Sequence, residues 1–150
     1  MGSSKTILVL HLAGRIPLGG VAWQALHYLI GLKRFGYDVY YIEDSGDWPY
    51  DPRVRSKVDN CSYSIDFLKT LIKKCDLGNR WSYWDMHNDT YYGLDGAAVR
   101  RLFEKADALF NICGATRLRE EHLACPIRVY VQTDPVYEQM REAQGDERVR

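Results

Sequence analysis

One stretch near the start of the chain decides the fold: residues 6–45, "TILVLHLAGRIPLGGVAWQALHYLIGLKRFGYDVYYIEDS". Its opening segment, residues 6–14, is mostly apolar and ends in a glycine, which is typical of a strand covered on both faces of a sheet. In residues 20–36, apolar side chains recur at steps of three and four, which predicts a helix that ends at Gly36. Residues 37–45 predict a second strand, so the stretch forms the βαβ unit of a parallel sheet.

The rest of the chain continues this alternation. Helices are expected over residues 64–78, where Gly78 ends the helix, over 95–106 and over 116–124, with Asp95 and Thr116 as N-caps. Further strands are expected over residues 107–114 and 126–134, and a last helix begins at Pro135. Residues 46–63 predict a long loop, and residues 79–96 show no clear pattern beyond one short strand. The prediction is an α/β fold with a doubly wound parallel sheet, in a single domain over residues 1–150.

Composition excludes several classes of function. Twenty basic and twenty acidic residues cancel, so nothing in the net charge indicates a nucleic-acid or acidic-membrane partner. No stretch is long enough to cross a bilayer, and the opening residues lack the pattern of a secretion signal, so we expect a cytoplasmic protein. The four cysteines and four histidines are scattered; we therefore expect no metal site, and buried reduced thiols rather than disulfides.

The glycine-rich turn between the first strand and helix is nearly a phosphate-binding loop. Gly14 and Gly19 have the spacing of G-x-x-x-x-G-K-[ST], but Gly20 and Val21 stand where that motif needs a lysine and a hydroxyl. A P-loop ATPase is therefore not expected, and the dinucleotide pattern G-x-G-x-x-G is absent as well. Two interpretations stay open: Gly19 and Gly20 bind an anionic ligand at the helix N-terminus, or they only let the helix pack against the sheet.

Other candidates lie where strands end, because ligands of such sheets gather beyond the carboxyl ends of the strands. Glu43 and Asp44 close the second strand and could hold a ribose, remain as solvated charges or supply a catalytic base. His11 lies inside the first strand, which favours a core histidine over a base. Asp134 could cap the last helix or contact a ligand.

Two further groups allow a functional and a structural interpretation. Aromatic residues are dense in the irregular stretches, where they could stack on a ligand ring or form a satellite core that pins the loops. They are Trp48, Tyr50, Trp81, Tyr83, Trp84, Tyr91 and Tyr92. The stretch from Gly114 to Arg119, with Thr116 and Arg117, could bind phosphate or carboxylate, or its arginines could pair with Glu120 and Glu121.

Residues 6–45 resemble the first βαβ unit of GT-B glycosyltransferases, which has a strand, a Gly-Gly turn, a helix ending in "L…G-[HY]-[DE]-V" and a second strand. Gly19–Gly20 and "LKRFGYDVYYIE" match that pattern. The later "ADALFNICGATRLREEHL" and "RVYVQTDP" are similar to the fourth and fifth strand units of the same amino-terminal domain. The resemblance implies a Rossmann-like domain that forms the acceptor-side half of a longer, two-domain enzyme.

This resemblance also implies an activity, the transfer of a sugar from a nucleotide-sugar donor to an acceptor hydroxyl. The glycine turn corresponds to Gly19 and Gly20, which would face the donor phosphates. Arg15 stands where some relatives carry a histidine, and Asp44 is the substitute base. The substrate-binding residues are expected to be Arg15, Gly19, Gly20, Trp48, Tyr50, Gly114, Thr116, Arg117 and Asp134.

The implied partners are the nucleotide-sugar donor, a small-molecule or glycan acceptor and a carboxy-terminal donor domain, and no cofactor is implied. Residues 1–150 alone are expected to be inactive. Two alternatives remain: an NAD(P)- or nucleotide-binding oxidoreductase domain that uses Glu43 or Asp44 for the ribose, and a non-catalytic interaction module.

Overall fold

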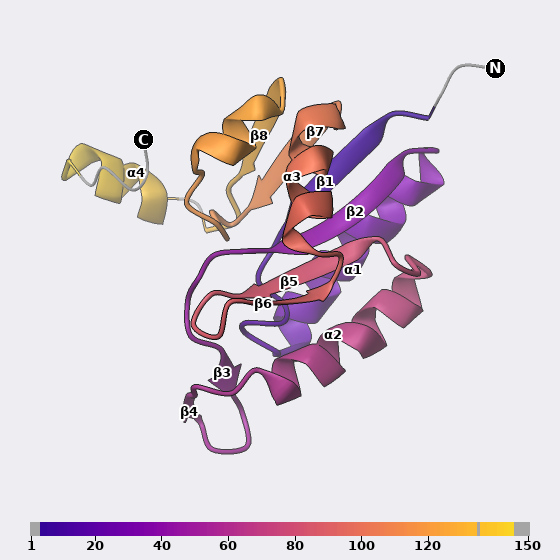
Figure 1. Cartoon of the computed structure of the whole chain (residues 1–150). Helices are drawn as coiled ribbons and strands as arrows, with labels where there is room; N and C mark the ends of the chain where they lie inside the picture. The colour runs from indigo at the N-terminus through magenta and orange to yellow at the C-terminus, as the bar shows by residue number, and fades with distance from the viewer. Residues whose placement is uncertain (1–3, 135, 146–150) are drawn as a thin grey trace.

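A computed structural model describes residues 4–134 and 136–145 of the chain. They form an α/β domain around a six-stranded sheet with the strand order β6-β5-β2-β1-β7-β8 (Figure 1). The sheet strands are β1 (Thr6–Leu10), β2 (Asp38–Glu43), β5 (Trp81–Asp85), β6 (Thr90–Gly93), β7 (Ala108–Ile112) and β8 (Ile127–Val131). The helices are α1 (Gly19–Arg34), α2 (Ser62–Cys75), α3 (Gly96–Lys105), the 3₁₀ helix η1 (Glu120–Ala124) and α4 (Tyr137–Ala143).

The sheet is mostly parallel. β2, β1, β7 and β8 pair in parallel, as does β5 with β2, whereas β6 runs antiparallel to β5 at one edge. The expectation of a wholly parallel sheet was therefore wrong at this edge. The βαβ unit predicted over residues 6–45 is confirmed as β1, α1 and β2.

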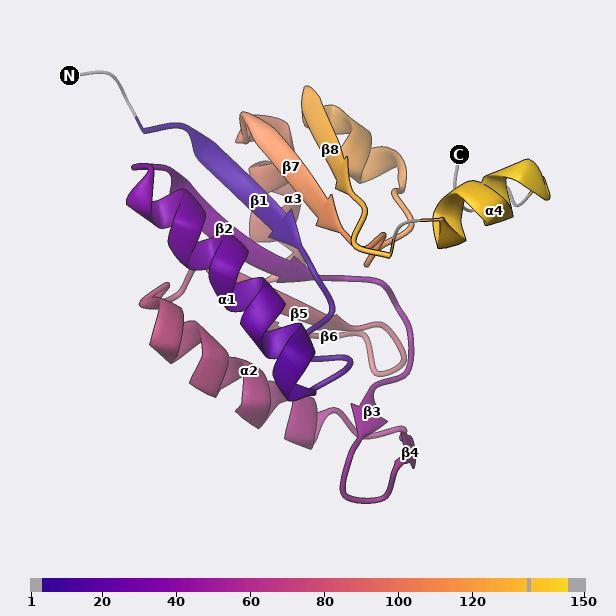
Figure 2. The same ribbon diagram turned by 180° about the vertical axis from the view of Figure 1, so that it is seen from behind.

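Helices cover both faces of the sheet. α1 and α2 lie on one face (Figure 2), and α3 lies on the other, next to η1 (Figure 1). Alternate residues of β1 serve the two layers: Val9 packs with Leu29 of α1, whereas Leu8 packs with Phe103 of α3. All four side chains are at most 1% exposed, which explains why β1 is an almost unbroken apolar run.

The helix ends follow the sequence signals in part. Gly36 adopts φ +87° just after α1, and the Asp95 side chain accepts a 2.7 Å hydrogen bond from the Ala98 amide, so both predictions are confirmed. At the end of α2, Asp76 with φ +52° is the C-cap, and Gly78 falls in the turn that follows. The predicted Thr116 cap is also wrong, because η1 begins after Arg119.

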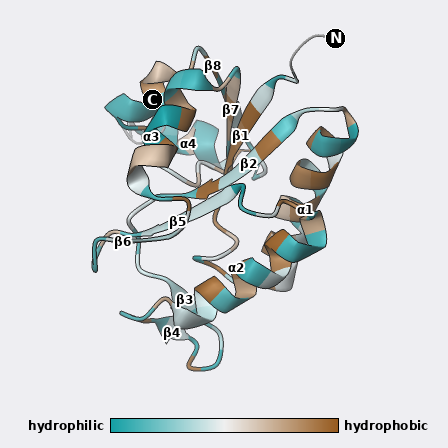
Figure 3. Ribbon diagram, turned by 45° about the vertical axis from the view of Figure 1, so that its right-hand side comes forward, coloured by the Kyte–Doolittle hydropathy of each residue, from teal (hydrophilic) through white to brown (hydrophobic). Residues whose placement is uncertain are grey.

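Two hairpins lie outside the predicted elements: one in the stretch predicted as a long loop, where that prediction was wrong in part, and one where a single short strand was expected. Residues 46–63 contain the small hairpin β3 (Tyr50–Asp51) and β4 (Ser56–Lys57), which lies apart from the main sheet and is largely hydrophilic (Figure 3). Residues 79–96 form β5 and β6, and β5 joins the sheet beside β2. Trp81 and Tyr83 of β5 are buried in the core, so for these two aromatics the structural interpretation holds.

Beyond β8 the structure describes one more helix, α4, none of whose residues is buried. Its N-cap is Val136 rather than the predicted Asp134, and Pro135 lies outside the described residues. Among the helices that the structure describes, none combines the length and apolar character needed to cross a membrane. The described cysteines are free thiols; Cys61, Cys75 and Cys125 are buried, and Cys113 is partly exposed.

Candidate functional site

The strands β1, β2, β7 and β8 are parallel, so the loops that follow them meet at the same side of the sheet, beyond the carboxyl ends of the strands. The connection from β1 runs through α1 to β2, and the connection from β7 runs through η1 to β8 on the opposite side. The strand order therefore reverses between β1 and β7. In open α/β sheets such a reversal opens a crevice at which ligands bind. We call this region, with residues 11–20, 44–49, 113–119 and 132–134, the switch-point edge.

Glu43, the last residue of β2, fixes the loop that follows β1. Its carboxylate accepts hydrogen bonds from the amides of Gly14 at 2.5 Å and Arg15 at 2.9 Å, and from the Tyr41 hydroxyl. Burial raises the pKa of Glu43 to about 7, against these hydrogen bonds, which favour the ionised form. Gly14 is required here for space, because a Cβ would lie 2.5 Å from a carbon of the buried Leu68.

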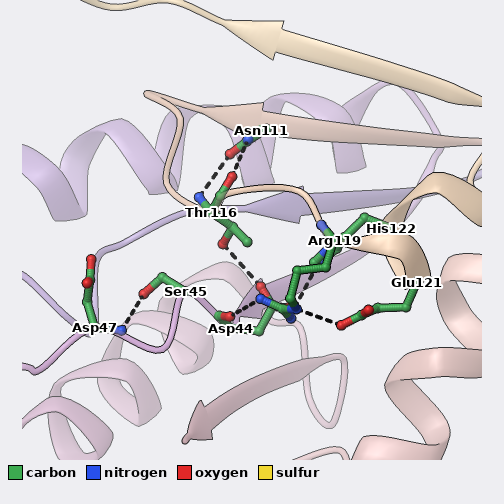
Figure 4. A network of polar contacts seen from close by, with 8 residues as sticks. All are labelled: Asp44, Ser45, Asp47, Asn111, Thr116, Arg119, Glu121 and His122. Atoms are coloured by element: carbon green, nitrogen blue, oxygen red, sulfur yellow. Dashed lines mark hydrogen bonds and ion pairs between the residues drawn. The ribbon is translucent and has the colours of Figure 1, made fainter. Parts of the chain in front are cut away.

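Asp44 is the acceptor at the centre of a closed polar network (Figure 4). One oxygen accepts from the Thr116 hydroxyl at 3.1 Å, and the other accepts from Arg119 Nη2 at 2.9 Å and from His122 Nε2 at 2.8 Å. The backbone carbonyl of Asp44 accepts a further bond from Arg119 Nη1. Asp44 is 3% exposed, so it is not a solvated strand-end charge. The network ties the end of β2 to the segment between β7 and β8.

The tautomer of His122 follows from its two contacts. Its Nδ1 accepts from the Arg119 amide at 2.8 Å, so the proton resides on Nε2 and is donated to Asp44. Burial alone would raise the pKa of Asp44, but the hydrogen bond from His122, with the charge of Arg119 and the hydroxyl of Thr116, holds it below its ordinary value. His122 and Thr116 are buried, and Asn111 holds Thr116 by two backbone hydrogen bonds. The groups around Asp44 therefore make their hydrogen bonds to one another and hold the surrounding loops in place.

The N-terminus of α1, in contrast, is open. Its N-cap is Leu18, which offers no capping side chain, and the amides of Gly19 and Gly20 have no acceptor among the described residues. Both glycines are exposed, neither has a positive φ, and a Cβ built on either would meet no atom within 4 Å. Packing against the sheet therefore does not require glycine here. The two N–H groups thus lie exposed at the positive end of the helix dipole, without a protein acceptor in the described part of the chain.

A second polar cluster lies beside α1, across the strand reversal. Gln24 Oε1 contacts His11 Nε2 at 3.0 Å and Cys113 Sγ at 3.2 Å, and the same sulfur lies 2.7 Å from the Thr133 hydroxyl. Burial lowers the pKa of His11 to about 4, against its bond to Gln24, so the imidazole is neutral at pH 7. Its Nδ1 is buried without a hydrogen-bond partner in the described part of the chain. The cluster joins the ends of β1, β7 and β8.

Cys113 and Gly114 follow β7 in the left-handed region, with φ of +57° and +60°. An L residue at such an angle is strained, and non-glycine residues of this kind gather at functional sites. A Cβ at Gly114 would also lie 2.8 Å from the hydroxyl of Tyr130, an exposed side chain that can move aside. The loop after β7 therefore has a fixed, unusual course at the switch-point edge.

Two hollows flank the N-terminus of α1. One, of about 400 Å³, lies between the β1–α1 loop and the β3–β4 hairpin and contains Arg15, Trp48 and Tyr50 in its lining. The other, of about 430 Å³, is bounded by α1 residues including Gly20, Trp23 and Gln24. Arg15, Gly19, Gly20, Trp48 and Tyr50 from the predicted set thus lie on or beside these hollows.

The other predicted site residues lie elsewhere. Gly114 is exposed in the loop after β7, Thr116 is buried against Asp44, and Arg117 and Asp134 are exposed at the surface. Arg119, rather than Arg117, makes the ion pairs of this segment, with Asp44 and Glu121. No group of three potential metal-ligating side chains occurs within residues 4–134 and 136–145.

Sequence reasoning missed the participation of His122, Gln24 and Cys113. His122 and Cys113 meet partners from distant parts of the chain, 78 residues away for His122 and Asp44 and 89 for Cys113 and Gln24.

No family model, curated protein or solved structure was found to match the chain. The geometry of the switch-point edge therefore carries the functional proposal.

Proposed function

We propose that this chain is the acceptor-side half of a GT-B glycosyltransferase, with a Rossmann-like fold. The enzyme would transfer a sugar from a nucleotide-sugar donor to an acceptor hydroxyl. In this reaction a base takes the acceptor proton while the oxygen attacks the anomeric carbon, and the nucleotide diphosphate departs. The amides of Gly19 and Gly20, with Arg15, would stabilise the negative charge that develops on the departing diphosphate.

One observation carries this proposal: the uncapped N-terminus of α1 opens at the reversal of strand order. A helix N-terminus that nothing caps is a ready anion site, because unpaired N–H groups and the helix dipole act together. Gly19 and Gly20 have no packing role there, which leaves the backbone open to the close approach of a ligand.

The oxidoreductase alternative has less support. A dinucleotide site of that type needs a free carboxylate at the end of the second strand to hold the ribose hydroxyls. Glu43 already accepts from two backbone amides and Tyr41, and Asp44 accepts from three side chains. Both carboxylates are at most 4% exposed, so neither is accessible to a ribose in this structure.

The catalytic role of Asp44 stays a prediction. To act as a base, its carboxylate would have to release at least one of the donors Thr116, Arg119 and His122. Its low pKa also makes it a weak base. Within this proposal the main task of Asp44 is to hold the loops of the switch-point edge together.

The test is a titration of the ¹⁵N-labelled chain with pyrophosphate, UDP-glucose, GDP-mannose and NADH, followed by the backbone amide signals in NMR spectra. We expect the Gly19 and Gly20 signals to shift with pyrophosphate and with at least one nucleotide sugar. NADH also carries a diphosphate, so tryptophan fluorescence separates the alternatives: NADH should not quench it, because Glu43 and Asp44 are both buried and do not offer a carboxylate to its ribose. A chain whose Gly19 and Gly20 signals ignore both nucleotide sugars, or respond only to NADH, would contradict the proposal.

A matched pair of variants sharpens the test. Gly20→Asp places a carboxylate where the anion would bind, so it should abolish the shifts while stabilising α1 through the helix dipole. Gly31→Asp introduces the same charge on the same helix, at a position that is also free of nearby atoms, and should leave binding intact. Equal loss of binding in both variants would indicate a general charge effect instead of a site.

A further inference from the structure

The hollow beside Arg15 is built as a binding groove of its own. It lies between the β1–α1 loop and the β3–β4 hairpin and has a volume of about 400 Å³. We call it the aromatic groove; its lining residues are Arg15, Ile16, Leu18, Asp47, Trp48, Tyr50 and Lys57. Leu18 immediately precedes Gly19 and Gly20, so the groove borders the proposed phosphate site.

The groove is held in shape before any ligand arrives. The amide of Tyr50 donates to the Arg15 carbonyl at 2.8 Å, which joins the β3–β4 hairpin to the β1–α1 loop. Glu43 holds the same loop by accepting a hydrogen bond from the Arg15 amide. A ligand therefore meets walls whose backbone is already fixed, which lowers the entropic cost of binding.

One wall is aromatic. The Trp48 ring stacks on His87 with 3.3 Å between ring centroids and an angle of 1° between the planes. This contact covers one face of the indole and fixes its orientation, yet Trp48 is still 40% exposed. Tyr50, two residues further on, begins the β3–β4 hairpin. A rigid ring face beside a tyrosine suits the flat, C–H-rich face of a sugar or another small ring.

The side chains that line the groove carry more positive than negative charge. Arg15 pairs through Nη1 with Asp47, but its Nε is buried without an acceptor among the described residues. Lys57 is exposed and makes no ion pair with any residue in the described ranges. Two cations thus face one carboxylate, and the guanidinium retains donors that Asp47 does not use.

From these features we infer that the aromatic groove binds a hydroxylated ring that carries one anionic group, a carboxylate or a phosphate. The ring stacks on Trp48, and the anion lies between Lys57 and Arg15. This inference rests on the proposed function, for which it names the acceptor class as an acidic sugar or a sugar phosphate. Asp47 competes with that anion for Arg15, so it limits the affinity for the ligand.

The experiment titrates the ¹⁵N-labelled chain with glucuronate, glucose 6-phosphate and glucose, and follows the Trp48 indole and Tyr50 amide signals. We expect one or both anionic sugars to bind about tenfold more tightly than glucose, as a charge-assisted hydrogen bond adds. Binding of glucuronate alone assigns the anion as a carboxylate, and binding of glucose 6-phosphate alone assigns it as a phosphate. Equal binding of glucose, or no response to any of the three, overturns the inference.

Variants test the two walls separately. Asp47→Asn frees Arg15, so it should strengthen the binding of the anionic sugars severalfold and leave glucose unaffected. Trp48→Leu should weaken all ring binding, whereas Phe35→Leu, at an exposed aromatic residue outside both hollows, should change nothing. Weaker anion binding in Asp47→Asn would contradict the arrangement.

The pyrophosphate titration separates this inference from the proposed function. If pyrophosphate shifts the Gly19 and Gly20 signals but no acidic sugar shifts the Trp48 signal, the aromatic groove is refuted and the phosphate site is retained. If acidic sugars shift the Trp48 signal but the Gly19 and Gly20 signals do not respond to pyrophosphate or nucleotide sugars, the transferase is refuted and an acidic-sugar site remains.

Discussion

Glu43 and Asp44 are adjacent in sequence, yet they serve different loops. Glu43 faces the α1 side and holds the backbone after β1, whereas Asp44 holds the segment after β7. Successive residues of an extended chain point to opposite faces, which accounts for this division. Their pKa values shift in opposite directions: burial dominates at Glu43 and raises its pKa, whereas at Asp44 the hydrogen bond from His122 and the charge of Arg119 outweigh burial.

The raised pKa of Glu43 makes stability depend on pH. The folded chain holds the Glu43 proton up to about pH 7, whereas the unfolded chain releases it near its ordinary value of 4.5. Between these values the folded state binds more protons, so its free energy of unfolding falls as the pH rises. Relative to Glu43→Gln, which cannot titrate, the wild type should lose on the order of 3 kcal/mol between pH 4.5 and 8. Urea unfolding at a series of pH values measures this; a difference that stays constant across the range contradicts the assigned pKa.

Removing the other carboxylate should be costly at neutral pH. Asp44→Ala leaves the buried donors of His122 and Thr116 without an acceptor and Arg119 without its main counter-charge. We expect a loss of about 3 kcal/mol in the free energy of unfolding, as is typical when one partner of a buried ion pair is removed. Asp66→Ala is the control, since Asp66 is exposed and pairs with Lys69 only at 4.0 Å. Similar losses in both variants would show that the network adds little.

At the scale of secondary-structure elements, the glycines of the β1–α1 loop have separate tasks. Gly14→Ala should destabilise the fold by about 1–3 kcal/mol, because its Cβ would overlap the buried Leu68. Gly20→Ala should stabilise it by about 0.5 kcal/mol, because the space is open and the backbone is helical. Thermal unfolding of the two variants measures this contrast, and a destabilised Gly20→Ala would mean that this glycine has a packing role after all.

The same loop illustrates how much the sequence could predict. Apolar periodicity and terminal glycines identify β1, α1 and β2 because each depends on neighbours along the chain. The β5–β6 hairpin was not predicted, because its polar side chains are buried through specific hydrogen bonds. Ser82 donates to the Leu94 carbonyl, and Asp85 accepts from Cys61 and Asn88. Burial of polar residues erases the alternation from which strands are predicted.

The candidate site was predictable to a smaller extent. Arg15, Gly19, Gly20, Trp48 and Tyr50 could be selected because strand ends and glycines mark the ligand edge of such a sheet. The role of Thr116 could not be predicted, because its hydroxyl donates to Asp44, 72 residues away, instead of capping the next helix. Long-range hydrogen bonds of this kind leave no local pattern.

At the scale of the whole molecule, the switch-point edge combines polar groups whose hydrogen bonds are satisfied within the domain with backbone amides that have no acceptor. Glu43 and Asp44 immobilise the loops after β1, β2 and β7, and all their bonds are made within the domain. Gly19 and Gly20, at the N-terminus of α1, retain unused donors. A rigid support around unsatisfied donors is the arrangement of a preorganised anion site.

The most direct measurement is a crystal structure of the chain with UDP, the diphosphate product of the proposed reaction. We predict diphosphate oxygens within about 3 Å of the amide nitrogens of Gly19 and Gly20, the distance of a hydrogen bond. A diphosphate bound at another edge of the sheet, with these two amides in contact only with solvent, would contradict the account.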